Sequence, residues 1–356
     1  MTSLDIGIVQ YALPWYREAL FASIASDPRV SDLTLYLPHP EAPGTPVDGV
    51  SIVSRPWHRH DLPAGRGPLT YLALPKSTRH DVLVFPWDLR RLEVWSAGIR
   101  RLKRRRGRSS QQHVLWGHGP STWHEGLGLT GFRLMERLFD LGLCYSGRDS
   151  TSIARLEVGN SLVWEPERPG EVSEWAWPDD ADIRALFVSR LQDRRKLWLA
   201  FDAISRLNGD GHKASMVVVG DGELDDRSAA AARRAGGRVH LLGAEHRQSV
   251  LRAMHRTATC GLYPAAAGLA AVLAAQNGLP VVVADDTRHG PEIALLQEAG
   301  GVVVEAPGDS LSVALLRASG LQVDDDVTTQ VRERFEPANH ARRIVDRLVE
   351  PKEVCR

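Results

Sequence analysis

Four basic residues fall within seven positions of the sequence, at Arg190, Arg194, Arg195 and Lys196. They follow the apolar run Leu186-Phe187-Val188, which we expect to form a buried strand, and the last three open a helical pattern. Cations at the carboxyl end of a strand suit an anionic ligand, and arginine can hold phosphate through two parallel hydrogen bonds. The alternative is an exposed loop with surface charge.

Two glycine-containing segments downstream have the composition of phosphate-binding turns. Gly220-Asp221-Gly222 interrupts an apolar run just before a helical pattern, and glycine permits the tight backbone at which a ligand or a helix approaches. An Ala-rich helix is predicted to begin near Gly268 and to stop at Gly278. Its N-terminal amides would then suit phosphate. Both segments also have a structural interpretation, since doubly wound folds use such turns and Ala-rich helices pack closely in cores.

The sequence contains ten tryptophans, nine of which precede residue 178. Flat aromatic faces stack on sugar rings and on other planar or apolar molecules, although tryptophan is also a good core residue. Several aromatic residues lie at or just after predicted strand ends, where a ligand would bind. The candidates for binding such a ligand are Tyr11, Trp15, Trp87, Trp116 and Trp123, and Trp57 has a similar position.

Two charged patterns are interpreted as structural. The acidic runs 285–286 and 324–326 are assigned to solvated surface rather than to a metal site. Segment 89–105 has apolar residues at helical spacing and arginines on its other faces. A basic amphipathic helix can lie on an anionic membrane, but the narrow stripe favours packing on a sheet, with cations at the helix carboxyl end.

The composition excludes several classes of protein. Lys+Arg and Asp+Glu both number 44, so no net charge favours nucleic acid, and 43% hydrophobic with 25% charged residues is ordinary globular composition. Three cysteines in no paired motif fit a reducing cytoplasm and give no metal framework. We read no signal peptide and no apolar run of 18 residues.

The candidate residues must be positioned by strands that alternate with helices, which predicts right-handed βαβ units and parallel sheets. The expected strands are 5–11, 33–37, 50–54, 81–86, 113–116 and 141–146, then 184–188, 215–219, 239–242, 260–263 and 280–284. Helices are expected at 15–25, 89–105, 122–140, 196–207, 223–236, 246–256 and 268–277.

The domain organisation follows from a lapse in this pattern. Residues 164–182 are rich in proline and acidic residues and are predicted to be a linker between an N-terminal domain, 1–163, and a C-terminal domain, 183–334. The tail, 335–356, is expected to be helical, broken at Pro337, and packed back toward the N-terminal domain. Two such Rossmann-like domains usually bind a ligand in the cleft that they face.

Residues 184–305 resemble the nucleotide-sugar domain of retaining GT-B glycosyltransferases, specifically glycosyltransferase family 4. The resemblance rests on the order and spacing of six short motifs. In this chain they are Val188-Ser189-Arg190-Leu191 with Arg195, Gly220-Asp221-Gly222, Leu241-Leu242-Gly243, Gly268-Leu269, Gly278-Leu279-Pro280-Val281 and Gly290-Pro291-Glu292-Ile293. The likeness over residues 1–163 is looser and includes Trp116-Gly117-His118-Gly119.

The resemblance implies roles for individual residues. Arg190 and Arg195 would bind the donor diphosphate, Arg195 standing where the family has lysine, with Lys196 as a neighbour. The remaining implied contacts are the backbone amides of Gly268, Leu269 and Ala270 for the phosphates, main-chain groups of Leu242, Gly243 and Ala244 for the nucleobase, and His118 as the catalytic residue near the donor sugar.

The sequence departs from the family at the donor-sugar site. The two glutamates that would bind the donor sugar and the ribose are replaced by Ala265 and Leu273, whose side chains accept no hydrogen bond. The N-terminal loop also lacks the family's Gly-Gly pair. We therefore expect either an unusual donor sugar or a protein that has lost activity.

The resemblance implies an α/β GT-B fold and a cytoplasmic glycosyltransferase that uses a nucleoside-diphosphate sugar and a small-molecule acceptor, without a metal or another cofactor. The candidate aromatic residues of the N-terminal domain would then bind the acceptor. Only five of the 44 basic residues are lysine, which is typical of high-GC bacteria and favours specialised natural-product (antibiotic) biosynthesis, with a sulfur or nitrogen nucleophile conceivable. The alternatives are a polysaccharide or glycolipid transferase at a membrane surface and an inactive GT-B binding or activator subunit. A nucleotide-sugar epimerase is disfavoured, because no cluster of carboxylates is found. The nucleobase, the stereochemical outcome and the oligomeric state stay open.

Overall fold

The computed structural model describes residues 3–38, 46–61, 68–74, 79–104, 111–118, 127–145, 153–164, 176–178, 180–245 and 247–350. The chain divides into two compact units. The first unit contains Met1–Val163 and Glu336–Arg356, and the second contains Trp164–Phe335. Most of the predicted linker, 164–182, lies outside the described residues.

Among the described residues of the first unit, seven parallel strands form one sheet, in the order β3-β2-β1-β6-β7-β8-β9. This is the Rossmann strand order, extended by one strand at the β8 edge. The strands are β1 (Leu4–Val9), β2 (Val30–Pro38), β3 (Val50–Arg55), β6 (Val82–Pro86), β7 (Gln112–Gly117), β8 (Leu141–Cys144) and β9 (Arg155–Glu157). The unit also contains an antiparallel hairpin, β4 (Trp57–His60) and β5 (Leu69–Leu72).

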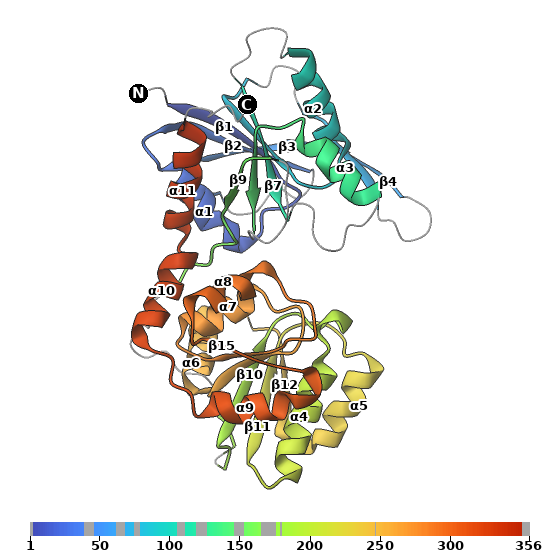
Figure 1. The fold of residues 1–356 in the computed structure, drawn as a ribbon, viewed down its shortest axis with the longest axis vertical. Helices are drawn as coiled ribbons and strands as arrows, with labels where there is room; N and C mark the ends of the chain where they lie inside the picture. Colours follow the sequence, from blue (N-terminus) through green and yellow to red (C-terminus); the bar gives the residue numbers. More distant parts are fainter. Residues whose placement is uncertain are drawn as a thin grey trace. The chain divides into compact units, whose positions relative to one another are not determined.

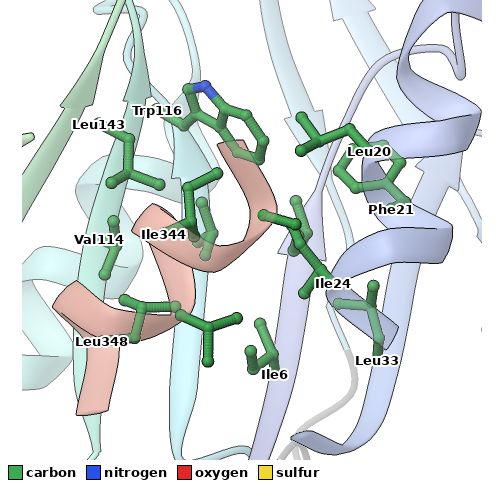
Figure 2. Packing of buried hydrophobic residues seen from close by; sticks show 14 of the residues in the cluster. Ile6, Leu20, Phe21, Ile24, Leu33, Val114, Trp116, Leu143, Ile344 and Leu348 are labelled. Atoms are coloured by element: carbon green, nitrogen blue, oxygen red, sulfur yellow. The ribbon is translucent and has the colours of Figure 1, made fainter. Parts of the chain in front are cut away.

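Helices cover both faces of the first sheet because successive residues of each strand point to opposite sides. Val82 and Val84 join a hydrophobic cluster with α1 (Trp15–Ala25), whereas Leu83 and Phe85 join a second cluster with α2 (Leu92–Arg104) and α3 (Leu127–Glu136). The first cluster also receives residues from the end of the chain, in α11 (Pro337–Val349). Figure 2 shows Ile344 and Leu348 of α11 among the residues of the sheet and of α1.

In the described part of the second unit, six parallel strands form a sheet in the order β12-β11-β10-β13-β14-β15, again the Rossmann order. The strands are β10 (Ile183–Val188), β11 (Ala214–Val219), β12 (Val239–Gly243), β13 (Cys260–Tyr263), β14 (Val281–Ala284) and β15 (Val303–Ala306). The connecting helices are α4 (Leu197–Gly209), α5 (Asp226–Ala235), α6 (Gln248–Thr257), α7 (Leu269–Gln276), α8 (Pro291–Ala299) and α9 (Leu311–Ser319), with short 3₁₀ turns at Asp193–Arg195, Gly236–Arg238 and Gly308–Ser310.

The C-terminal helical segment is broken at Pro337, as predicted. Helix α10 (Asp325–Phe335) packs on α7 and α8 of the second unit, and α11 begins at Pro337 and packs beside α1 of the first unit (Figure 1). Proline is tolerated at the first position of a helix because the amide that it lacks would be unpaired there. The chain therefore passes from one unit to the other at the turn before α11.

The prediction of two Rossmann-like parallel-sheet units is confirmed, and each predicted strand has an observed counterpart within a few residues. The hairpin β4–β5, strands β9 and β15, and helices α8 and α9 were not predicted. The helix predicted over 122–140 is observed as α3, Leu127–Glu136; 119–126 lie outside the described residues, and 137–140 are not helical, so the prediction ran too far at that end. No helix in the described ranges has the length and apolar character needed to cross a membrane.

Candidate functional site

The candidate site of the second unit lies at the carboxyl edge of its sheet, where the strand order reverses between β10 and β13. The loop after β10 is bound to the glycine turn after β11. The amide of Ser189 donates to the Val219 carbonyl at 2.9 Å, and that of Leu191 donates to Asp221 at 2.6 Å. Gly220 has φ +153°, and a Cβ there would collide with the carbonyl oxygen of Ser189. The glycine thus permits the close approach of the two loops.

Arg195 is held in place by its backbone and by one hydrogen bond. It ends the 3₁₀ turn Asp193–Arg195, and its Nη1 donates to the carbonyl oxygen of Ala266 in the loop after β13. Its buried Nε has no hydrogen-bond partner, and no described carboxylate forms an ion pair with it. Burial, and then repulsion from Arg194 and Arg190, lower the pKa of Arg195. The site therefore has positive charge that the described residues leave uncompensated.

The other predicted cations lie at the same edge. Arg190 follows the end of β10 and is exposed, and its charge acts on Arg195. Lys196 is also exposed and caps α4 in the left-handed conformation, with φ +49°. The structure thus brings Arg190 and Arg195 together, with Lys196 next to them in the chain.

Helix α7 begins at Leu269 with Gly268 as its N-cap, and Gly278 follows its end with φ +74°, as predicted. The first amides of a helix, here those of Leu269 and Ala270 after Gly268, have no partner within the helix. The loop before α7 is fixed by the loop after β14: Ala266 donates to the Arg288 carbonyl at 2.6 Å and Gly290 donates to the Ala267 carbonyl at 2.5 Å.

The two residues expected from the sequence to stand in place of the family's glutamates have different surroundings. Ala265 is 2% exposed, so its methyl group is part of the core, and Leu273 is half-buried on α7. Glu292, quoted in the sequence only as part of a motif, lies close by: a Cβ on Gly268 would be 3.5 Å from its Oε2. Glu292 is buried in the first turn of α8. Its nearness to Gly268 arises from the fold, because the two residues are 24 positions apart in the chain.

The residues assigned to the nucleobase end β12, an edge strand. Leu242, Gly243 and Ala244 are exposed, and the Gly243 carbonyl accepts a 2.8 Å hydrogen bond from Gly220. They therefore lie beside the glycine turn, on the same side of the sheet as Arg190.

The first unit has its own cavity, of about 750 Å³, at the carboxyl ends of β1, β6, β7 and β8; we call it the unit 1 pocket. This volume is in the range of small-molecule sites. Of the predicted residues it is lined by Tyr11, Trp87, Trp116 and His118. The pocket is also lined by Gln10, Arg17, Asp88, Arg90, Phe132 and Tyr145.

His118 directly follows β7 at the rim of the pocket, and its ring meets that of Tyr145 edge to face, with centroids 4.6 Å apart. Desolvation, and then the charge of Arg17, lower the pKa of His118, so the imidazole is neutral at pH 7. Trp15 is 62% exposed at the start of α1 and does not line the pocket, and Trp123 lies outside the described residues.

Comparison with known proteins agrees with this arrangement. Residues 182–318 match the family "Glycosyl transferases group 1". No curated protein matches the chain. Similar solved structures include HepE from Anabaena, determined with UDP and glucose (TM-score 0.62, 14% identity, 98% of this chain and 100% of that one). The lipopolysaccharide outer core galactosyltransferase WaaB is also similar (TM-score 0.65, 13% identity, 96% of this chain and 98% of that one). A UDP-N-acetylglucosamine 2-epimerase is similar as well (TM-score 0.53, 15% identity, 98% of this chain and 96% of that one).

At these identities the solved structures establish the fold, and they confirm the predicted GT-B architecture. The family match covers the part of the second unit that holds the arginines, the glycine turn and α7. The family match and the fold together identify the chain as a glycosyltransferase with the GT-B fold.

Proposed function

We propose that the protein transfers a sugar from a nucleoside-diphosphate sugar to a small-molecule acceptor, with the donor at the carboxyl edge of the second unit and the acceptor in the unit 1 pocket. The observation that carries the donor assignment is the half-buried Arg195 guanidinium, which has no carboxylate partner among the described residues. The same unit contains α7, whose first amides have no partner within the helix. Buried charge without a partner is costly, so an anionic ligand is the expected counter-charge.

In the proposed reaction the bond between the anomeric carbon and the diphosphate oxygen breaks, and a bond to the acceptor nucleophile forms. Negative charge grows on the leaving diphosphate, and fixed positive groups stabilise that charge in the transition state. Arg190, Arg195 and the amides at the start of α7 would supply this stabilisation. Neutral His118 can accept a hydrogen bond from a substrate hydroxyl. Its replacement by asparagine should remove the acid limb of the pH–rate profile, and an unchanged limb would reject this role.

The donor-sugar site would differ from that of family 4 because Ala265 and Leu273 offer no oxygen. We propose a donor that lacks a hydroxyl, or carries a bulky group, where the family's first glutamate binds. Retention of the anomeric configuration is part of the proposal, and the anomeric coupling constant in the product's NMR spectrum tests it. We also propose that no metal takes part, in which case EDTA would leave turnover unchanged.

The test of the donor assignment is a calorimetric titration of the full chain with UDP, GDP and dTDP. UDP is tried first because HepE was solved with it. Binding of one of the three is expected, and no binding to any would refute the transferase proposal. Turnover is then measured with the matching nucleotide sugars. Transfer of the sugar would show an enzyme, whereas binding without turnover would indicate an inactive binding subunit, the alternative supported by Ala265 and Leu273 at the positions of the family's glutamates.

A glycolipid or polysaccharide acceptor is the second candidate. WaaB acts on lipopolysaccharide by its name, and α2 leaves Leu92, Ile99 and Leu102 exposed, at 40%, 48% and 44%. A basic helix with exposed apolar side chains can bind an anionic bilayer. Cosedimentation with vesicles containing anionic lipid, lost on Ile99→Glu, would favour this candidate. If the acceptor is not a lipid or polysaccharide, we propose an enzyme of specialised metabolism, such as antibiotic biosynthesis. We place it in the cytoplasm, because the buried thiols Cys144 and Cys260 fit a reducing compartment.

A further inference from the structure

Arg17, in the first turn of α1, is a buried cation without an acidic partner among the described residues. It is 7% exposed. Its Nη1 donates to Oε1 of Gln10 at 3.0 Å and its Nη2 to the hydroxyl of Tyr145 and, at 3.5 Å, to Oδ1 of Asn160. Its Nε has no partner, and the guanidinium lies 5.1 Å from the ring centroid of Trp116. Buried charges are normally paired, because desolvation of an unpaired ion is costly.

Three further donors of the unit 1 pocket are buried without a hydrogen-bond partner. They are the hydroxyl of Tyr11 and the Nε1 atoms of Trp87 and Trp116. The two tryptophans are 5% and 4% exposed, and an indole N–H can only donate. Burial raises the pKa of Tyr11, so its hydroxyl keeps its proton. In Figure 2 the nitrogen of Trp116 lies on the side of the ring away from Ile344 and Leu348.

The acidic residue that lines the pocket does not compensate these donors. Asp88 accepts two hydrogen bonds from the Arg90 side chain, at 3.0 and 2.8 Å, and one from the Arg90 amide at 3.0 Å. Burial alone would raise the pKa of Asp88, but the bonds from Arg90 keep it lowered. Asp88 is thus committed to Arg90, and Arg17 lies in a pocket that offers it no free acidic partner among the described residues, beside three side-chain donors without a hydrogen-bond partner.

We propose that the unit 1 pocket binds an oxyanion, a carboxylate or phosphate group carried by the acceptor substrate, through Arg17 and the indole N–H groups of Trp87 and Trp116. This inference rests on the acceptor role proposed above for the pocket. An oxyanion supplies both the charge that Arg17 lacks and acceptors for the unpartnered donors of residues that line one cavity. The indoles and Phe132 would contact an apolar or ring portion of the same molecule.

Two sources could supply the oxyanion: the acceptor itself or the diphosphate of the donor. We assign it to the acceptor because the second unit already has phosphate-binding candidates in Arg190, Arg195 and the start of α7. The acceptor class is then an acidic molecule, and a neutral sugar or polyol would bind poorly.

The experiment uses the full chain labelled with 5-fluorotryptophan, with the resonances of residues 87 and 116 assigned through Trp87→Phe and Trp116→Phe. Fluorine NMR titrations are run with inorganic phosphate, with acetate and, as the neutral control, with glycerol, at constant ionic strength. Phosphate or acetate should shift both resonances saturably, and glycerol should not. Arg17→Gln should weaken the anion response by about tenfold or more, whereas Arg133→Gln, an exposed arginine on α3, should leave it unchanged.

No saturable response to either anion, or an equal response in Arg17→Gln, would overturn the proposal. If Arg17→Gln does not fold, Arg17→Lys takes its place: it keeps the charge but loses the planar fork, so a weakened response is expected and an unchanged one counts against the proposal. A second titration adds saturating UDP. If UDP abolishes the phosphate response, the oxyanion belongs to the donor and the acceptor assignment is wrong; if the response persists with UDP and in Arg195→Ala, it stands. Calorimetry with UDP reports the donor proposal separately, so either proposal can fail alone.

Discussion

Replacing Arg195 with alanine is expected to weaken binding of the cognate nucleoside diphosphate by roughly a hundredfold. One N–H of its guanidinium is committed to the Ala266 carbonyl, which fixes the group, while Nε–H is unpaired and buried. Two charge-assisted hydrogen bonds to phosphate, offset by the desolvation of the ligand, are worth about 3 kcal/mol, and 1.4 kcal/mol corresponds to a factor of ten. The substitution also removes the support of Ala266, whose φ of +51° is unusual for alanine.

The matched control is Arg194→Ala. Arg194 is the preceding residue, it is exposed, and its Nε donates to Oε1 of Gln192 at 2.8 Å. Both substitutions remove one positive charge, so the long-range effect on an anion is similar, and the control should stay within about threefold of the unchanged chain at 0.15 M salt. Calorimetric titrations of the three proteins give the comparison. Equal losses in the two variants would show that bulk charge acts rather than a fixed guanidinium, and would refute the reasoning.

Three other substitutions and conditions have expected outcomes. Gly220→Ala should lower the free energy of unfolding by about 3 kcal/mol or more, because its Cβ meets the Ser189 carbonyl at φ +153°, whereas Gly209→Ala has open space and should be neutral or stabilising in the same urea titration. Ile344→Ala, which removes a 2% exposed side chain of α11, should cost about 2–5 kcal/mol, and the 43% exposed Val349 on the same helix should tolerate alanine; similar midpoints would contradict the packing described. Burial lowers the pKa of His255 to about 4, below the value near 6.5 of the unfolded chain, so the unfolded state binds the proton more tightly. Above pH 6.5 this group should leave the free energy of unfolding unchanged, and between pH 6.5 and 4 it should lower that free energy by about 3 kcal/mol. In urea titrations at a series of pH values, His255→Leu should remove this decrease.

Much of the fold could be predicted from local patterns. Buried parallel strands are continuous apolar runs, so Val217-Val218-Val219 and Val281–Ala284 are evident, and Pro337 marks the end of a helix by its own geometry. Strand β4, Trp57–His60, is exposed along its whole length and has no apolar alternation. Its pairing with β5 depends on register across the hairpin, which no local pattern encodes.

The candidate site was less accessible to sequence reasoning. The arginines after β10 are close in sequence and were found, but the significance of Arg17 depends on what is absent around it. Its contacts come from Gln10, Tyr145 and Asn160, up to 143 residues away in sequence. Whether an arginine has an acidic partner is a property of the folded chain, since any of 44 acidic residues could have supplied one.

The return of α11 to the first unit has a consequence for synthesis of the protein. The second unit is one continuous stretch, Trp164–Phe335, so its folding waits for no segment that is translated after it. The first unit is translated first but remains without four residues of its core until α11 has been made after the second unit; these are Ala341, Ile344, Val345 and Leu348. Although domains usually mature in the order in which they are translated, here the second unit can be finished first. The nascent first unit would meanwhile expose the apolar face of its sheet and α1, which is the surface that a chaperone would recognise.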